Sequence, residues 1–213
     1  MRRALLIVLL AAAGRAETID GIAAVVGRHA IAWSDVRREA RLSAYVDRRP
    51  PQAPVPDSAA GRQVLERLIE LRLVRLEMEQ TAFPSAGDEQ RRQWLAKLGG
   101  NGEGPAAYGL REEDLLEYAR RQLDLLAFIE LRFKAGARVS PDEVRAHYET
   151  TLVPEMKRKG VAVPPPLDDL RRQIEEILQQ QRADEMFEQW LIDQRAAVRI
   201  QVMGAEKLAG AEK

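Results

Sequence analysis

Apolar residues recur along most of this chain at the three- and four-residue spacing of amphipathic helices. Short apolar runs rich in β-branched residues stand near its two ends. The helical spacing predicts helices over about 34–46, 57–80, 85–98, 111–133, 140–151 and 167–195. Residues 22–26 and 30–33 read as two short strands around a turn at Gly27, and residues 197–202 alternate like a third strand. The pattern therefore predicts a mainly α-helical fold with a small β-sheet.

Several helices carry recognisable start signals. Ser34 and Asp35 are both candidates for the N-cap of the first helix, and Ser85 is the candidate for the third. Ser140, Pro141 and a glutamate three residues after the serine form a capping-box signature.

Two of the predicted helices are expected to supply much of the core. The helix over 57–80 is apolar on more than one side, which is typical of a central helix packed by several neighbours. The buried side of the helix over 111–133 is expected to include Leu115, Leu126 and Phe133.

Proline- and glycine-rich segments separate the helices. Residues 48–56 hold four prolines and predict a loop, and residues 154–166 predict a linker. The glycine-rich break at 99–104 lacks the Gly-Lys-Ser/Thr of a phosphate loop. A single helical turn is expected over 105–108, and the small and charged residues 204–213 predict a disordered tail.

Residues 1–16 have the features of a cleaved export signal. Two arginines precede an apolar run of ten residues over 4–13, whereas a membrane-spanning helix needs about 20. Small residues predict cleavage after Ala16, with cleavage after Ala13 or an uncleaved membrane anchor as alternatives. We therefore expect a mature chain exported to the periplasm without stable membrane insertion.

Composition narrows the functional classes. Removal of residues 1–16 lowers Lys plus Arg from 33 to 30 against 33 Asp plus Glu, which leaves a net charge of −3. That balance gives no support to nucleic-acid binding, which needs a basic patch. The chain has no cysteine, so disulfides, thiolate catalysis and cysteine-ligated zinc are excluded.

No group of residues forms a recognisable catalytic or metal-binding motif. The two histidines, His29 and His147, have no partners at metal-ligand spacing. The acids 112–114 complement the dipole of the helix that they begin, and the basic run 157–159 is typical of a solvated surface. The three tryptophans, Trp33, Trp94 and Trp190, are interpreted as core anchors rather than ligand platforms. We expect no enzyme activity, cofactor or metal.

The order of these segments resembles the SurA type of periplasmic chaperone. The resemblance lies in IDGIAAVVGRHAIAWSDVRREAR, VLERLIELRLVRLEMEQ, YGLREEDLLEYARRQLDLLAFIELRF with RVSPDEVRAHYE, and PLDDLRRQIEEILQQQRADEMFEQWLIDQRAAVRIQV. It implies an N-terminal helical chaperone region over 17–153, completed by a C-terminal helix and strand over 167–203. It also implies pairing between the strand at 22–26 and the strand near the C-terminus.

The chain departs from this family in one large respect. Family members commonly carry parvulin-type prolyl isomerase domains where this chain has only residues 150–166, which are too few for a domain of about 100 residues. The resemblance therefore implies an ATP-independent chaperone without the isomerase, which holds unfolded outer-membrane proteins. Trp94 and Tyr108 are the candidate client-binding residues. An envelope adaptor or a non-catalytic subunit of a separate isomerase or protease is the alternative, and a homodimer is left open.

Overall fold

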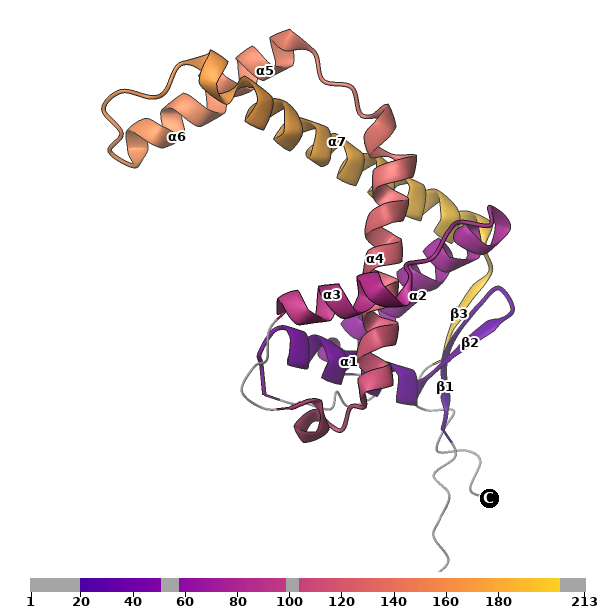
Figure 1. Cartoon of the computed structure of the whole chain (residues 1–213). Helices are drawn as coiled ribbons and strands as arrows, with labels where there is room; N and C mark the ends of the chain where they lie inside the picture. The colour runs from indigo at the N-terminus through magenta and orange to yellow at the C-terminus, as the bar shows by residue number, and fades with distance from the viewer. Residues whose placement is uncertain (1–19, 51–57, 99–103, 204–213) are drawn as a thin grey trace, which may run out of the picture.

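A computed structural model of the chain describes residues 20–50, 58–98 and 104–203, and Figure 1 shows their arrangement. A small sheet and several helices form a body, and a second group of helices extends away from it (Figure 1). The mainly helical fold with a small sheet is confirmed. The predicted signal at 1–16, the predicted tail at 204–213 and part of two predicted loops lie outside the described residues.

The three-stranded antiparallel sheet joins residues from both ends of the described chain. β1 (Ile22–Val26) lies between β2 (His29–Ala32) and β3 (Ile200–Val202). The turn from β1 to β2 places Gly27 at φ +60°, a conformation that glycine adopts without steric cost. Gly27 N–H also donates to the carbonyl of Arg199 at 2.9 Å, so the turn is tied directly to the C-terminal strand. The predicted pairing of the two chain ends is confirmed.

The first helix begins earlier than the sequence suggests. α1 (Trp33–Val46) follows β2 without a loop, and its N-cap is Ala32 rather than Ser34 or Asp35. Asp35 lies in the first turn, where its carboxylate accepts from the N–H of Ala32 at 3.0 Å. The N-cap prediction was wrong because the Asp35 side chain reaches back to satisfy a free backbone donor from the N3 position instead.

α2 (Ala59–Gln80) is the central helix of the body. Its N-cap is Ser58, whose hydroxyl accepts from the N–H of Gly61 at 3.0 Å. The predicted start at residue 57 lies outside the described residues. α2 contacts β1, α1, α4 and α7, which confirms that it is packed by several neighbours. Its buried side chains are Leu65, Leu68, Ile69, Leu73, Val74 and Met78.

α3 (Asp88–Leu98) packs on α4 (Glu112–Arg132), with a short 3-10 turn, η1 (Pro105–Tyr108), between them in the chain. Ser85 does not cap α3. Its hydroxyl donates instead to Asp124 on α4 at 2.6 Å, and the first turn of α3 is supported by Gln90, which accepts from the N–H of Gly87 at 2.9 Å. The predicted turn at η1 is confirmed, and it ends at Gly109, with φ +64°.

The second group of helices, residues 141–182, is called the arm. It consists of α5 (Pro141–His147), a π-helical turn η3 (Tyr148–Leu152), α6 (Val153–Arg158) and the first half of α7 (Leu167–Ala197). Figure 1 shows α7 running from the arm into the body. The capping box predicted at residue 140 is confirmed. A 3-10 turn, η2 (Lys134–Gly136), links α4 to the arm.

The predicted linker over 154–166 was wrong in its first part, which is helical. Pro154 stands in the first turn of α6, where a proline ring is tolerated. The π-helical turn lies directly before it, with the N–H of Val153 donating to the carbonyl of Tyr148. This widened turn relieves the clash that the proline ring would make with the preceding turn, so the chain continues as helix up to Arg158.

The buried apolar residues form three clusters. One lies between the sheet, α1 and α2, and a second lies between α1, η1 and α4. The third joins α2, α4 and α7 around Phe128, which contacts Phe83, Phe133 and Trp190 with ring centroids 5.3–5.9 Å apart. Leu126 was predicted to be buried but is 59% exposed, because α4 packs Phe128 inward at this level instead.

Candidate functional site

The candidate site is a cavity of about 380 Å³ between α1, α2 and α4. Its apolar lining comes from all three helices and the end of β2, and consists of Ile31, Leu42, Leu68, Leu71, Val74, Met78 and Leu125. Around this apolar floor stand six acidic and five arginine side chains. The cavity thus combines seven apolar side chains with eleven charged ones, which is more charge than the mostly apolar lining of small-molecule pockets.

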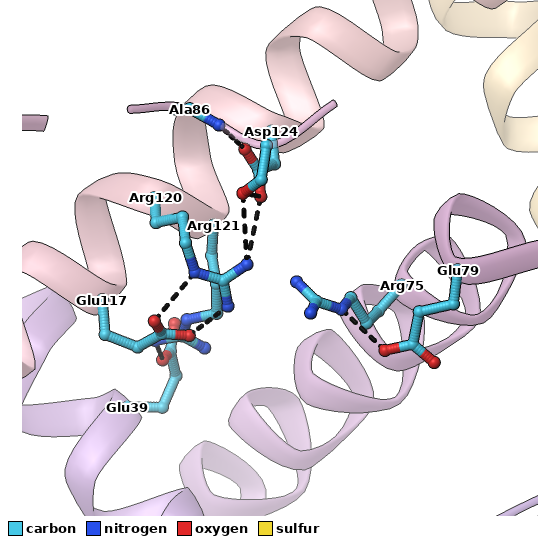
Figure 2. Close-up of polar contacts among 9 residues, drawn as sticks. Glu39, Arg75, Glu79, Ala86, Glu117, Arg120, Arg121 and Asp124 are labelled. Atoms are coloured by element: carbon cyan, nitrogen blue, oxygen red, sulfur yellow. Dashed lines mark hydrogen bonds and ion pairs between the residues drawn. The ribbon is translucent and has the colours of Figure 1, made fainter. Parts of the chain in front are cut away.

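The most buried charged residue of the cavity lining is Glu39. Glu39 is only 1% exposed, and it lies on the buried side of α1. Its Oε2 accepts from an Nη atom of Arg121 on α4 at 2.7 Å (Figure 2). Its Oε1 is also buried but has no hydrogen-bond partner among the described residues. A buried carboxylate that is only half satisfied is costly, because folding removes it from water without replacing every hydrogen bond.

A second polar network on α4 fixes one wall of the cavity. Arg120 donates to both oxygens of Glu117 and, at 3.2 Å, to Asp124 (Figure 2). The hydrogen bond from Arg120 lowers the pKa of Glu117, and the same bond raises the pKa of Arg120. Asp124 also accepts from the N–H of Ala86 at 2.7 Å. The network therefore holds the segment before α3 against α4 and favours the charged forms of Glu117 and Arg120.

The opposite wall carries its own ion pair. Arg75 on α2 donates through Nε to Glu79 at 2.8 Å, and this hydrogen bond lowers the pKa of Glu79. Figure 2 shows the guanidinium of Arg75 extending from α2 toward the side of Arg120 and Asp124. The two charged walls thus face each other across the cavity.

At the α1 edge of the cavity, Arg38 bridges two helices. Its guanidinium lies 3.5 Å from Asp35 on α1 and 3.8 Å from Asp114 on α4. The pKa of Asp114 is lowered, first by the hydrogen bond that it accepts from the N–H of Arg111. Asp114 therefore caps the first turn of α4 through this hydrogen bond. The acids 112–114 lie in that turn, where negative charge is favourable to the helix dipole.

The two predicted client-binding residues lie together, but outside this cavity. Trp94 and Tyr108 belong to the cluster between α1, η1 and α4, where the ring of Trp94 lies 6.1 Å from that of Tyr118. Tyr108 is 6% exposed, and its hydroxyl donates to the carbonyl of Arg49 at 3.0 Å. Trp94 is half-buried. Contact of a client with either residue stays a prediction.

The other residues singled out in the sequence are spread over the fold. Trp33 and Trp190 are buried, in agreement with their interpretation as core anchors. His29 begins β2 and His147 ends α5, both partly buried. The basic run 157–159 is exposed at the end of α6. Within the described ranges, no three potential metal ligands come together, and no helix is long and apolar enough to cross a membrane.

The sequence reasoning missed Glu39, although a signal for it exists. Trp33, Val36, Glu39 and Leu42 follow each other at intervals of three, and all four are buried in the structure. A glutamate within an otherwise apolar helical stripe marks a buried charge. The partner of Glu39 could not be found in this way, because Arg121 lies 82 positions further along the chain.

Comparison with known proteins assigns no family to the chain. No protein-family model matches it, and no curated protein matches it significantly.

Proposed function

We propose that this protein is an ATP-independent holdase chaperone of the periplasm that binds unfolded outer-membrane protein precursors. The observation that carries the proposal is the cavity between α1, α2 and α4. Its floor is apolar and its rim consists largely of ion-paired charges. This combination suits binding better than covalent chemistry, because the arginines and carboxylates of the rim stabilise each other.

The surface of the molecule is compatible with transient binding of many sequences. Apolar side chains are exposed on α4, on the loop before α7 and on α7 itself, among them Leu131, Val163 and Ile177. Burial of apolar area is non-directional, so it supports binding without a fixed client sequence. Figure 1 shows the arm extending away from the body that contains α1, α2 and α4, so one client can contact several weak sites along its length.

The chain topology adds support for the resemblance on which the periplasmic assignment rests. β1 pairs with β3, so the helix and strand after residue 166 complete the body that the N-terminal half begins. That arrangement is what the SurA-type resemblance implies. It also explains how a chain with few residues between α6 and α7 closes its core without an inserted domain.

The proposal is tested by aggregation of an outer-membrane protein. The precursor is unfolded in urea and diluted into buffer without ATP, and light scattering is followed with and without the purified protein. We expect suppression at a near-stoichiometric ratio. Replacement of Leu71 by Trp, which fills the cavity, should weaken the suppression. Replacement of Ile192 by Trp serves as the matched control, because Ile192 is 60% exposed on α7 and does not line the cavity.

The same preparation distinguishes the alternatives. Absence of suppression together with co-purification of one folded partner would favour the envelope adaptor. Prolyl isomerase activity in the pure chain would contradict the non-catalytic assignment. The compartment is tested by cell fractionation and by the mass of the purified protein, which should begin at Glu17 if the signal is cleaved after Ala16.

A further inference from the structure

Glu39 lines the cavity, and its carboxylate has a hydrogen-bond acceptor that no described residue uses. Glu39 is only 1% exposed, and its Oε1 has no hydrogen-bond partner in the described part of the chain. A carboxylate offers about four acceptor positions, and Arg121 occupies a position on Oε2 only. Such a group binds a donor strongly, because the donor relieves a desolvation cost that the folded protein already carries.

The charges around Glu39 favour a cationic donor over an anion. Six acidic side chains and five arginines line the cavity. One of these arginines, Arg72, has no ion pair among the described residues. The other arginines are engaged, as the pair between Arg75 and Glu79 and the pair between Arg120 and Glu117 illustrate. An incoming anion could meet Arg72 without breaking a pair, but it would add negative charge to a cavity that holds the buried Glu39 carboxylate, whereas a cation completes the coordination of the free carboxylate oxygen.

The apolar floor defines what carries the cation. Leu42 and Leu68 line the cavity together with Glu39, so an aliphatic stem can pack on them while its charged end reaches the carboxylate. A volume of about 380 Å³ is near the lower end for ligand pockets, and it suits one or two side chains rather than a folded element. Lysine and arginine side chains combine a stem of methylene groups with a terminal cation.

We propose that this cavity binds a lysine or arginine side chain of an extended polypeptide, with Glu39 as the acceptor for its charged end. The inference rests on the proposed holdase function and narrows its client class. Segments in which a basic residue is flanked by apolar residues are bound in preference to purely apolar or acidic segments. Glu39 selects among clients, and the apolar floor contributes affinity that does not depend on charge.

The test uses fluorescently labelled ten-residue peptides with both ends blocked. Apolar residues flank one variable position, which is lysine, arginine, norleucine or glutamate. Binding to the full mature chain is measured by fluorescence anisotropy at low salt. We expect the Kd of the lysine and arginine peptides to be about tenfold lower than that of the norleucine peptide, and the glutamate peptide to bind most weakly. Raising the salt concentration should reduce the difference.

Variants of the protein test whether Glu39 causes the preference for basic peptides. Replacement of Glu39 by Gln should reduce the difference between lysine and norleucine to less than about twofold. Glu66→Gln is the matched control, because Glu66 pairs with Arg195 on another side of α2 and does not line the cavity. It should retain the tenfold difference. If Glu39→Gln does not fold, the peptide series on the wild-type chain still decides the matter, and Leu71→Trp provides a second variant that should abolish the preference.

Equal affinities across the wild-type series, tightest binding of the glutamate peptide, or an unchanged preference in folded Glu39→Gln would each overturn the inference. Failure of the inference and failure of the holdase proposal can be told apart. If the wild-type chain suppresses aggregation but does not discriminate among the peptides, only the basic-residue selectivity is wrong. If it neither suppresses aggregation nor binds any peptide, both are wrong.

Discussion

The ion pair between Glu39 and Arg121 gives a sharp test of the packing of α1 against α4. Replacement of Arg121 by Met removes the only described hydrogen-bond partner of the Glu39 carboxylate and leaves its charge buried. It also removes the guanidinium from its position 5.6 Å from the ring of Tyr118. We therefore expect the single replacement to lower the free energy of unfolding much more than its location on a partly exposed helix face suggests.

The expected magnitude follows from the burial of the two partners. Removing one member of a buried ion pair costs about 3–5 kcal/mol, because the other charge stays desolvated without compensation. Arg121 retains 24% side-chain exposure while Glu39 retains 1%, so we expect a loss near the lower end, about 3 kcal/mol. For a domain of this size that corresponds to a decrease in Tm of about 6–12 °C. Replacing both residues, with Leu at position 39, should return the stability to within about 1 kcal/mol of wild type.

Urea unfolding followed by circular dichroism at 222 nm measures the free energy of unfolding of the single and the double variant. The midpoint should fall in the single variant and recover in the double variant, with the m-value unchanged in both, since the buried area changes little. A single variant that loses less than about 1 kcal/mol would mean that water reaches the Glu39 carboxylate, which contradicts its burial in the structure. A double variant as unstable as the single one would refute the reasoning, because the loss would then not arise from an uncompensated charge.

Three further predictions concern other parts of the fold. Phe128→Ala should lower the free energy of unfolding by about 3–5 kcal/mol in urea, because Phe128 is 2% exposed among three aromatic rings, whereas Leu126→Ala on the exposed face should change it by less than about 0.5 kcal/mol. Gly109→Ala should cost about 1–2 kcal/mol in the same assay because of its φ of +64°, and Gly104→Ala, at a φ of −66°, should not. The pKa of Glu143 is lowered to about 2, first by the N–H of Ser140 and then by an arginine of α7. This interaction stabilises α5 above the ordinary glutamate pKa and is lost as pH falls from about 4.5 toward 2, so NMR titration should give that midpoint and hydrogen exchange in α5 should quicken over the same range. An ordinary midpoint near 4.5 would show that neither the capping bond from Ser140 nor the bond from α7 forms.

Local signals in the sequence predicted the elements well where the deciding interactions are local. The helix over 111–133 corresponds to α4 within one residue at each end, because acids at its start and Gly109 before it act within a single turn. The capping box at residue 140 was predicted for the same reason. The predicted N-caps at Ser85 and at the start of α1 were wrong because the side chains form other hydrogen bonds. Ser85 donates to Asp124 on α4, and Asp35 accepts from the N–H of Ala32. Asp124, the partner of Ser85, lies 39 positions away and cannot be identified from spacing along the chain.

The sequence by itself determined the helical class, the approximate positions of the strands and the absence of cysteine chemistry, since periodicity, capping residues and composition are properties of the chain alone. The tertiary structure decided which faces meet. It joined β1 to β3, turned Leu126 outward in favour of Phe128, and enclosed the Glu39 carboxylate beneath Arg121. The cavity exists only because α1, α2 and α4 cross where these residues lie. Long-range packing therefore placed a charge where local preferences alone favour an apolar side chain.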